Sequence, residues 1–274
     1  MLNFIRLQIQ GGHNAESISS MLISQGWTTD DVNEGIVAAK SLQPKEQIIT
    51  VEYARAEINN FIHRVYAWMT GGLAITGAIA YLVSNNDNLT QLILGNLFIF
   101  FGLLIAELVC VVYLARAVQS MNSIQAAVIF LLYAALNGLT ISVIFLVYTI
   151  SSIGSVFIIT AGTFGLTSLY GFFTKKDLTT VGNFAVMALI GIVLASVVNL
   201  FFYNDTTSLI ISYIAVLVFV LLTAWDTQKI KNLNAIVKIG TEIERKESIV
   251  GALTLYLDFI NLFLNLLRIM GRRR

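Results

Sequence analysis

Ionisable side chains within long apolar stretches are the residues of this chain best suited to chemistry. Three are acids, Glu107, Asp226 and Asp258, and Arg268 is the clearest base. A charged group at the centre of a lipid bilayer costs about 2.5 to 3.5 kcal/mol, so such residues are candidates for a functional site by default. The competing interpretation is that they form structural ion pairs.

A stripe of polar residues in the last apolar segment is the most informative pattern. Its members follow one another at spacings of 4, 3, 4 and 3 residues: Thr254, Asp258, Asn261, Asn265 and Arg268. These spacings place all five side chains on one face of a helix. Such a face cannot lie against lipid, so this helix is expected at the centre of a bundle. Hydrogen bonding between helices is one explanation of the stripe, but its length favours a polar pathway.

Asp226 and Asp258 are expected to lie at similar depths in the membrane. Asp226 is near the end of one segment, and Asp258 is about nine residues into the next, which is ~13 Å along a helix from the same side. Two neighbouring carboxylates in a low dielectric cannot both ionise at low cost, so the pair is expected to hold a proton and to titrate as a unit.

Calcium prefers carboxylate oxygens and would compete with the proton on Asp226 and Asp258. Two aspartates supply few of the roughly six to eight oxygens that calcium takes. The predicted metal site is therefore weak and pH-dependent, which suits passage of the ion better than storage.

Glu107 and Arg268 are expected to pair with each other. Their helices run in opposite directions, and each residue lies about ten residues outward of the cytoplasmic polar group on its own helix. An acid and a base at the same depth in a membrane stabilise each other.

The composition indicates a membrane protein. Of 274 residues, 57% are hydrophobic and only 12% are charged, about half the charged share of soluble domains. The net charge of +1 gives no electrostatic case for nucleic acid. One cysteine, Cys110, and two histidines, His13 and His63, are too few for a buried zinc or iron site. No cofactor is expected, and calcium enters only as a bound or transported ion.

Seven apolar segments follow residue 63, each near the ~20 residues that a bilayer requires. They cover residues 64–84, 91–115, 124–147, 152–173, 181–203, 207–226 and 249–270. The sequence therefore predicts an all-α fold, in which residues 64–274 form a bundle of seven transmembrane helices with the last helix central. Close helix approach is expected at four small residues, Gly71, Gly72, Ala161 and Gly165.

Residues 1–63 are more polar and are predicted to form a small cytoplasmic helical module and linker. One helix is expected over residues 14–25, and a second follows the N-cap Thr28 until Pro44 interrupts it. The apolar faces of these helices comprise Ile18, Met21, Leu22, Val32, Ile36 and Ala39. A docking site for a protein partner is the alternative interpretation of this module.

The charges of the loops predict the orientation of the chain. Basic residues follow the second, fourth and sixth segments: Arg116, Lys175, Lys176, Lys229, Lys231 and Lys238. The loops between them carry no base, so the basic loops and the N-terminus are expected to face the cytoplasm. Seven crossings then place Arg272–Arg274 outside, against the rule. Either the last segment does not fully cross the membrane, or the charges of the earlier loops determine the orientation despite the basic tail. We favour the second interpretation.

These residues resemble the transmembrane Bax-inhibitor-motif family. The similarity rests on Trp225-Asp226-Thr227-Gln228, on LYLDFINLF at residues 255–263, on Arg268, on Glu107 and on Gly138-Leu139-Thr140, and it covers the chain from about residue 60. The resemblance implies a seven-helix fold and a calcium leak gated by protonation of an aspartate pair, here Asp226 and Asp258. Some members carry an arginine on the second helix that latches the closed state. Arg116 is the candidate latch, but it lies about half a turn off the face of Glu107.

The sequence favours one function over three alternatives. The first is a passive, pH-sensitive calcium leak channel, not an enzyme, in the bilayer of a bacterial inner membrane, as short loops and the lack of a targeting peptide suggest. The second is an intramembrane aspartyl protease, but Leu255-Tyr256-Leu257 stand where that family has glycine-x-glycine, and Pro44 is the only proline. The third is a regulatory protein that binds a membrane protease or another partner. A retinal receptor is disfavoured, because the last segment contains no lysine.

Overall fold

The computed structural model describes residues 5, 8, 14–24, 27–117, 120–233 and 241–274, and for residues 40–58 and 233 it describes the backbone alone. The described chain is helical apart from turns and one isolated bridge. It divides into two compact units, Met1–Asn59 and Asn60–Arg274, four residues before the boundary expected from the sequence. Within the described residues, seven helices are long and apolar enough to cross a membrane, which confirms the predicted fold class.

The N-terminal unit contains α2 (Ala15–Ser24) and the first part of α3 (Thr29–Ser84). Its core is formed by Ile5, Ile18, Leu22, Val32, Ile36 and Ala39. Met21 was expected on the same apolar face, but its side chain is 41% exposed, because the four-residue spacing of Ile18 and Leu22 defines the buried face and Met21 lies beside it. The expected helix end at Gln25 and Gly26 lies outside the described residues.

Pro44 does not interrupt its helix, contrary to the prediction. The backbone of α3 is helical from Thr29 to Ser84. A proline removes one backbone hydrogen bond and typically costs about 3 kcal/mol, but a helix of 56 residues retains its bonds on both sides of the interruption.

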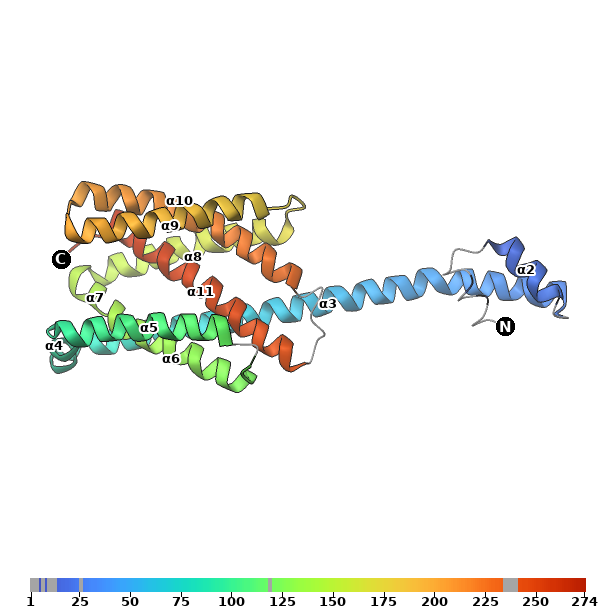
Figure 1. Ribbon diagram of the computed structural model, residues 1–274, viewed down its shortest axis with the longest axis horizontal. Coiled ribbons are helices and arrows are strands. Elements are labelled where there is room, and N and C mark those ends of the chain that lie inside the picture. The colour runs from blue at the N-terminus through green and yellow to red at the C-terminus, as the bar shows by residue number, and fades with distance from the viewer. Residues whose placement is uncertain (1–4, 6–7, 9–13, 25–26, 118–119, 234–240) are drawn as a thin grey trace. The chain divides into compact units, whose positions relative to one another are not determined.

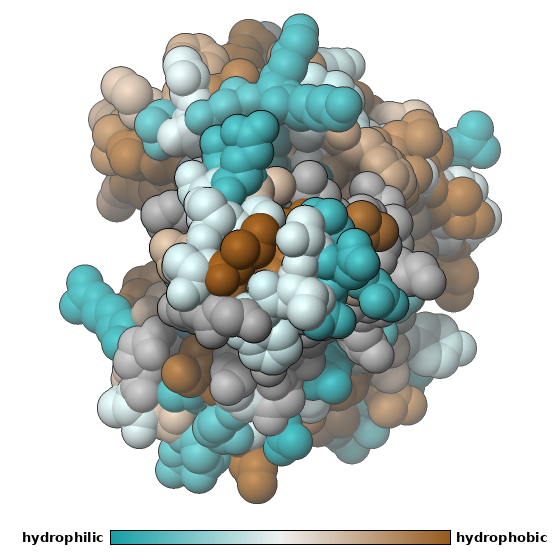
Figure 2. All heavy atoms as spheres, turned by 90° about the vertical axis from the view of Figure 1, so that its right-hand side faces the viewer, coloured by the Kyte–Doolittle hydropathy of each residue, from teal (hydrophilic) through white to brown (hydrophobic). Residues whose placement is uncertain are grey.

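The second unit contains the seven spanning helices. They are the end of α3 (Asn59–Ser84), α5 (Leu97–Ala117), α6 and α7 together (Ser123–Ile141 and Val143–Val147), α8 (Ile150–Phe173), α9 (Thr179–Phe201), α10 (Asp205–Leu233) and α11 (Glu242–Met270). Large hydrophobic side chains lie at the surface, such as Phe98 (91% exposed) and Phe202 (78%), as expected where lipid is the solvent. In Figure 2, hydrophobic residues (brown) lie at the surface of the chain alongside hydrophilic ones (teal).

The predicted second span is wrong at its start. Residues expected at the beginning of that span form a separate short helix, α4 (Asp87–Leu94), which Asn86 caps by accepting a hydrogen bond from the Leu89 amide. Gly95 ends α4, and α5 begins two residues later. Polar side chains break the apolar run here, so the spanning helix can start only after them.

Helix α11 is the core of the bundle, as predicted. Figure 1 shows it running obliquely between α5 and α6 on one side and α8, α9 and α10 on the other, and it packs against α6, α8 and α10. In the most apolar part of α11, 61% of the residues are buried, whereas the corresponding shares are 6% in α9 and 11% in α5. Leu255, Tyr256 and Leu262 are fully enclosed.

The C-terminal tail lies against the turn between α7 and α8. The Arg274 amide donates to Val147 O (2.9 Å), and the Thr149 amide donates to Arg272 O (3.1 Å). Helix α11 therefore crosses the whole bundle and ends beside residues 148–152. Of the two explanations for the basic tail, the structure supports complete crossing.

Candidate functional site

Asp226 of α10 and Asp258 of α11 meet inside the bundle. Their side chains are 7% and 4% exposed, and the two carboxyl groups lie within hydrogen-bonding reach of each other. Asp258 Oδ2 is buried and has no hydrogen-bond donor among the described residues. Lys229 lies one turn after Asp226 and is exposed, with its Nζ 5.2 Å from the centre of the Trp225 ring. A proton, a cation or a water molecule bound here would satisfy Asp258 Oδ2.

Two glycines allow neighbouring helices to approach α10 beside Asp226. A Cβ on Gly171 of α8 would collide with Ala224 O, and one on Gly182 of α9 would collide with the Trp225 ring. The sequence reasoning missed both, since glycines are frequent throughout these spans. It named other positions instead, of which Gly72 packs against Phe130.

The prediction of close helix approach is wrong for the other two glycines. A Cβ on Gly71 or Gly165 would meet nothing within 4 Å. The amino acid type alone does not tell which face of a helix a glycine occupies, so the sequence could not separate these positions from Gly171 and Gly182.

Gln228 fixes the turn between α8 and α9 next to Asp226. Its Nε2 donates to Lys176 O (2.8 Å), and its Oε1 accepts from the Leu178 amide (2.9 Å). In the same turn, the hydroxyl and the amide of Thr179 donate to Asp177 Oδ1 and hold the pKa of that exposed carboxyl below its usual range. The motif Trp225–Gln228 is thus a packing and turn-fixing element as well as the carrier of Asp226.

Lys231 of α10, the helix that carries Gln228, stabilises the C-terminal end of α8. Its Nζ donates to Phe172 O (2.6 Å) and lies 5.1 Å from the centre of that residue's ring. A cation here also complements the negative end of the α8 dipole.

Glu107 does not pair with Arg268, contrary to the prediction. Its Oε1 accepts from the Thr140 hydroxyl (2.7 Å) and its Oε2 from Asn137 Nδ2 (3.1 Å). Neutral donors on the adjacent α6 satisfy both oxygens, so the carboxyl needs no cation. Arg268 is exposed at the far end of α11.

A buried chain of hydrogen bonds continues from Glu107 across the bundle. Tyr256 of α11 donates its hydroxyl hydrogen to Asn137 Oδ1 (3.1 Å), and the same hydroxyl oxygen lies 2.7 Å from Thr76 Oγ1 of α3. The polar groups of four helices therefore meet around Tyr256, which the sequence reasoning did not select because an isolated tyrosine carries no spacing pattern.

The polar stripe of α11 is present, but its members bond within their own helix. The Thr254 hydroxyl donates to Val250 O, and the side-chain amides of Asn261 and Asn265 donate to Leu257 O and Asn261 O. All three side chains are partly buried. The stripe is therefore buried or partly buried from Thr254 to Asn265 and exposed at Arg268, and the bonds of the described residues do not join it into a continuous chain.

Arg116 is exposed near the end of α5 and makes no ion pair with a described residue. The structure does not bring this candidate latch to either aspartate. Another arginine makes an ion pair at the start of α11: Arg64 Nη1 of α3 lies 3.2 and 3.1 Å from the two carboxylate oxygens of Glu244, which is 1% exposed.

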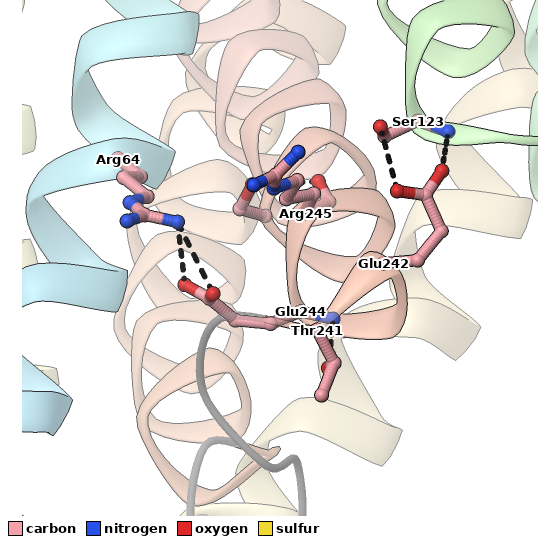
Figure 3. Close-up of polar contacts among 7 residues, drawn as sticks. Arg64, Ser123, Thr241, Glu242, Glu244 and Arg245 are labelled. Carbon is pink, nitrogen blue, oxygen red and sulfur yellow. Dashed lines mark hydrogen bonds and ion pairs between the residues drawn. The ribbon is translucent and has the colours of Figure 1, made fainter.

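Glu242, in the same first turn of α11 as Glu244, contacts a third helix, α6, as Figure 3 shows. Glu242 accepts hydrogen bonds from the amide and the hydroxyl of Ser123, the first residue of α6. The Thr241 hydroxyl oxygen accepts from the Glu244 amide and caps α11. We call the contacts of Glu242 and Glu244 the α11 clamp. The pattern Thr241-x-x-Glu244 is a signal for a helix start that the predicted start at residue 249 overlooked.

The carboxylate pair is not a complete metal cage. Among the described residues, no group of three or more His, Cys, Asp or Glu side chains is placed to hold a metal ion. A calcium ion at Asp226 and Asp258 would need water or backbone carbonyls for its remaining ligands.

Residues 58–274 match the family described as "Inhibitor of apoptosis-promoting Bax1". This chain belongs to the Bax inhibitor family. It is 49% identical over 221 residues to the inner membrane protein YbhL of Escherichia coli K12, which covers 80% of this chain and 94% of that protein. It is 35% identical over 226 residues to an uncharacterized membrane protein of Streptococcus pyogenes serotype M3, covering 81% of this chain and 97% of that protein. As a member of this family with seven spanning helices, the chain is a multi-pass integral membrane protein.

Proposed function

We propose that this protein is a pH-sensitive calcium leak channel of the bacterial inner membrane, with its N-terminus in the cytoplasm. The observation that carries the proposal is the buried contact between Asp226 and Asp258, in which one carboxylate oxygen has no donor. A proton can bridge the pair and exclude calcium, and a calcium ion can replace that proton. The basic loops after α5, α8 and α10 support the orientation.

The sign of the pH dependence follows from this competition. At low pH the pair is protonated and has little affinity for a divalent cation. As the pH rises the proton is lost, and the two carboxylates together attract calcium. Calcium flux is therefore expected to increase with pH across the range in which the pair titrates.

The test is calcium flux into proteoliposomes at a series of pH values, for the parent chain and for Asp226→Asn and Asp258→Asn. Each asparagine removes one carboxylate and supplies a permanent donor, so flux is expected to fall at least tenfold at high pH and to lose its pH dependence. Asp87→Asn is the matched control, because Asp87 is an exposed acid at the start of α4. The proposal would be contradicted if the parent chain conducts no calcium at any pH, or if the calcium flux of the aspartate variants equals that of the parent.

A regulatory binding function is the second candidate. Residues 1–57 lie outside the family match, form part of a compact unit with its own core, and expose Trp27 and Val37. These features favour a docking module for a protein partner. This candidate becomes the better account if the physiological activity survives loss of both aspartates.

A further inference from the structure

A cavity of about 540 Å³ opens at the end of the bundle where the C-terminal tail lies. One wall is apolar and is formed by Ile144 and Val147 of α6–α7, Leu209 of α10, and Leu264 and Leu267 of α11. Its volume is in the usual range for a site that takes a small molecule. The apolar wall belongs to spanning helices, so an amphiphile that enters from the membrane can reach it.

Charged and polar side chains line the other part of the cavity. They include Arg268, Arg273, Asp205, Tyr203 and Tyr148. Neither arginine forms an ion pair with a described residue. Asp205 Oδ1 accepts a hydrogen bond from the Tyr203 hydroxyl (2.6 Å). That bond raises the pKa of Tyr203, while Arg268 and Arg273 act in the opposite direction. Both arginines line the cavity together with Tyr203. The cavity therefore presents two cations against one acid.

The two guanidinium groups converge from separately held segments. Arg268 lies in the last turn of α11. Arg273 is held by the pairing of the tail with residues 147–149, through its bridge to Tyr148 and the flanking backbone hydrogen bonds. Arg272 adds a bond from its amide to Ser152 Oγ (2.8 Å). The tail is thus fixed by its backbone, and Arg273 is part of the cavity lining.

Four arginines at this end of the bundle need an explanation. Arg268 and Arg272–Arg274 lie at the end opposite the basic loops. Basic residues are normally scarce on the side of the membrane away from the cytoplasm. An anion that binds them there would explain why they occur at this end.

We infer that this cavity binds an anionic phospholipid, with the headgroup phosphate between Arg268 and Arg273 and an acyl chain along the apolar wall. Guanidinium groups bind phosphate through paired, charge-assisted hydrogen bonds. A lipid with net negative charge is favoured over a zwitterionic lipid, because the cationic part of a zwitterionic headgroup would lie near two arginines. The site is separate from the aspartate pair and does not depend on calcium conduction, while the placement of the four arginines away from the cytoplasm rests on the proposed orientation.

The experiment is native mass spectrometry of the purified full chain in detergent, titrated with phosphatidylglycerol or with phosphatidylcholine of the same acyl chains. The first lipid is expected to bind at least tenfold more tightly than the second. The double variant Arg268→Gln/Arg273→Gln is expected to lose that preference. Arg272→Gln/Arg274→Gln is the matched control, because it removes the same charge from the same end but leaves the cavity lining unchanged.

Three outcomes would overturn the inference. Equal binding of the two lipids by the parent chain would show that the phosphate site gives no selectivity, and this comparison needs no variant. An equal loss in both double variants would indicate diffuse attraction to basic residues. Displacement of phosphatidylglycerol by millimolar inorganic phosphate would identify free phosphate as the ligand. Thermal unfolding of each variant verifies that it is folded.

Discussion

Tyr256 shows how one residue can join several helices. Its ring is fully buried and meets Phe130 and Tyr133 edge to face, with ring centres 5.8 and 5.7 Å away. Its hydroxyl links Asn137 to Thr76. Through Asn137, this single side chain of the core helix is connected to the carboxyl of Glu107.

Tyr256→Phe is expected to lower the free energy of unfolding by about 1 kcal/mol, because the ring remains and the hydroxyl bonds are lost. Thermal unfolding in detergent measures the change. Tyr213→Phe is the control, since that ring is 54% exposed and its hydroxyl has no partner among the described residues. Equal effects of the two substitutions would mean that the Tyr256 hydroxyl does not stabilise the fold.

The candidate residues differ in how far the sequence could predict them. Asp226 and Asp258 stand out because acids within apolar segments are rare, and the structure brings them together. The partner of Glu107 could not be predicted, because it depends on the rotation of α5 and α6 about their axes. A carboxyl that neutral donors satisfy looks the same in sequence as one that needs an arginine.

At the scale of helices, the apolar runs predicted seven spans, but the polar ends of the helices were missed. Helix α11 begins at Glu242, seven residues before the predicted start, and α10 extends to Leu233. These extensions contain charged residues that lower the apparent apolarity while continuing the helix. Hydrophobicity locates the membrane portion of a helix, and capping residues such as Thr241 locate its end.

Gly171→Ala is expected to destabilise the protein by about 1 to 3 kcal/mol, the usual cost of overpacking, because the added carbon would press on the α10 backbone at Ala224. Gly165→Ala in the same helix is the control. Its added carbon meets no atom within 4 Å, and alanine favours helix more than glycine does. Unfolding of both variants in detergent decides the matter, and a harmless Gly171→Ala would disprove the close contact of α8 with α10.

At the scale of the whole membrane unit, the two ends of α11 are held differently. The α11 clamp attaches the first turn to α3 and α6 through charged side chains. The last turn is followed by a tail that pairs with the α7–α8 turn through its backbone. Any movement of Asp258 along the axis of α11 must disturb one of these attachments.

Arg64→Gln and Glu244→Gln, singly and together, test the charged part of the clamp. A double-mutant cycle of unfolding free energies is expected to give a coupling of about 1.5 to 3 kcal/mol, the range for hydrogen bonds to charged groups. Arg64→Gln combined with Asp87→Asn is the control, since no ion pair joins those residues. A coupling below about 0.5 kcal/mol for Arg64 and Glu244 would be no larger than that of independent sites.

The central position of α11 has a consequence for biosynthesis. It is the last of the seven spans to leave the ribosome, yet a larger share of its residues is buried than in any other described span. Until α11 inserts, lipid or water must therefore fill the space that this helix will occupy between the six earlier helices. Asp226 has no partner during that interval, and its contact with Asp258 forms only when the final helix inserts.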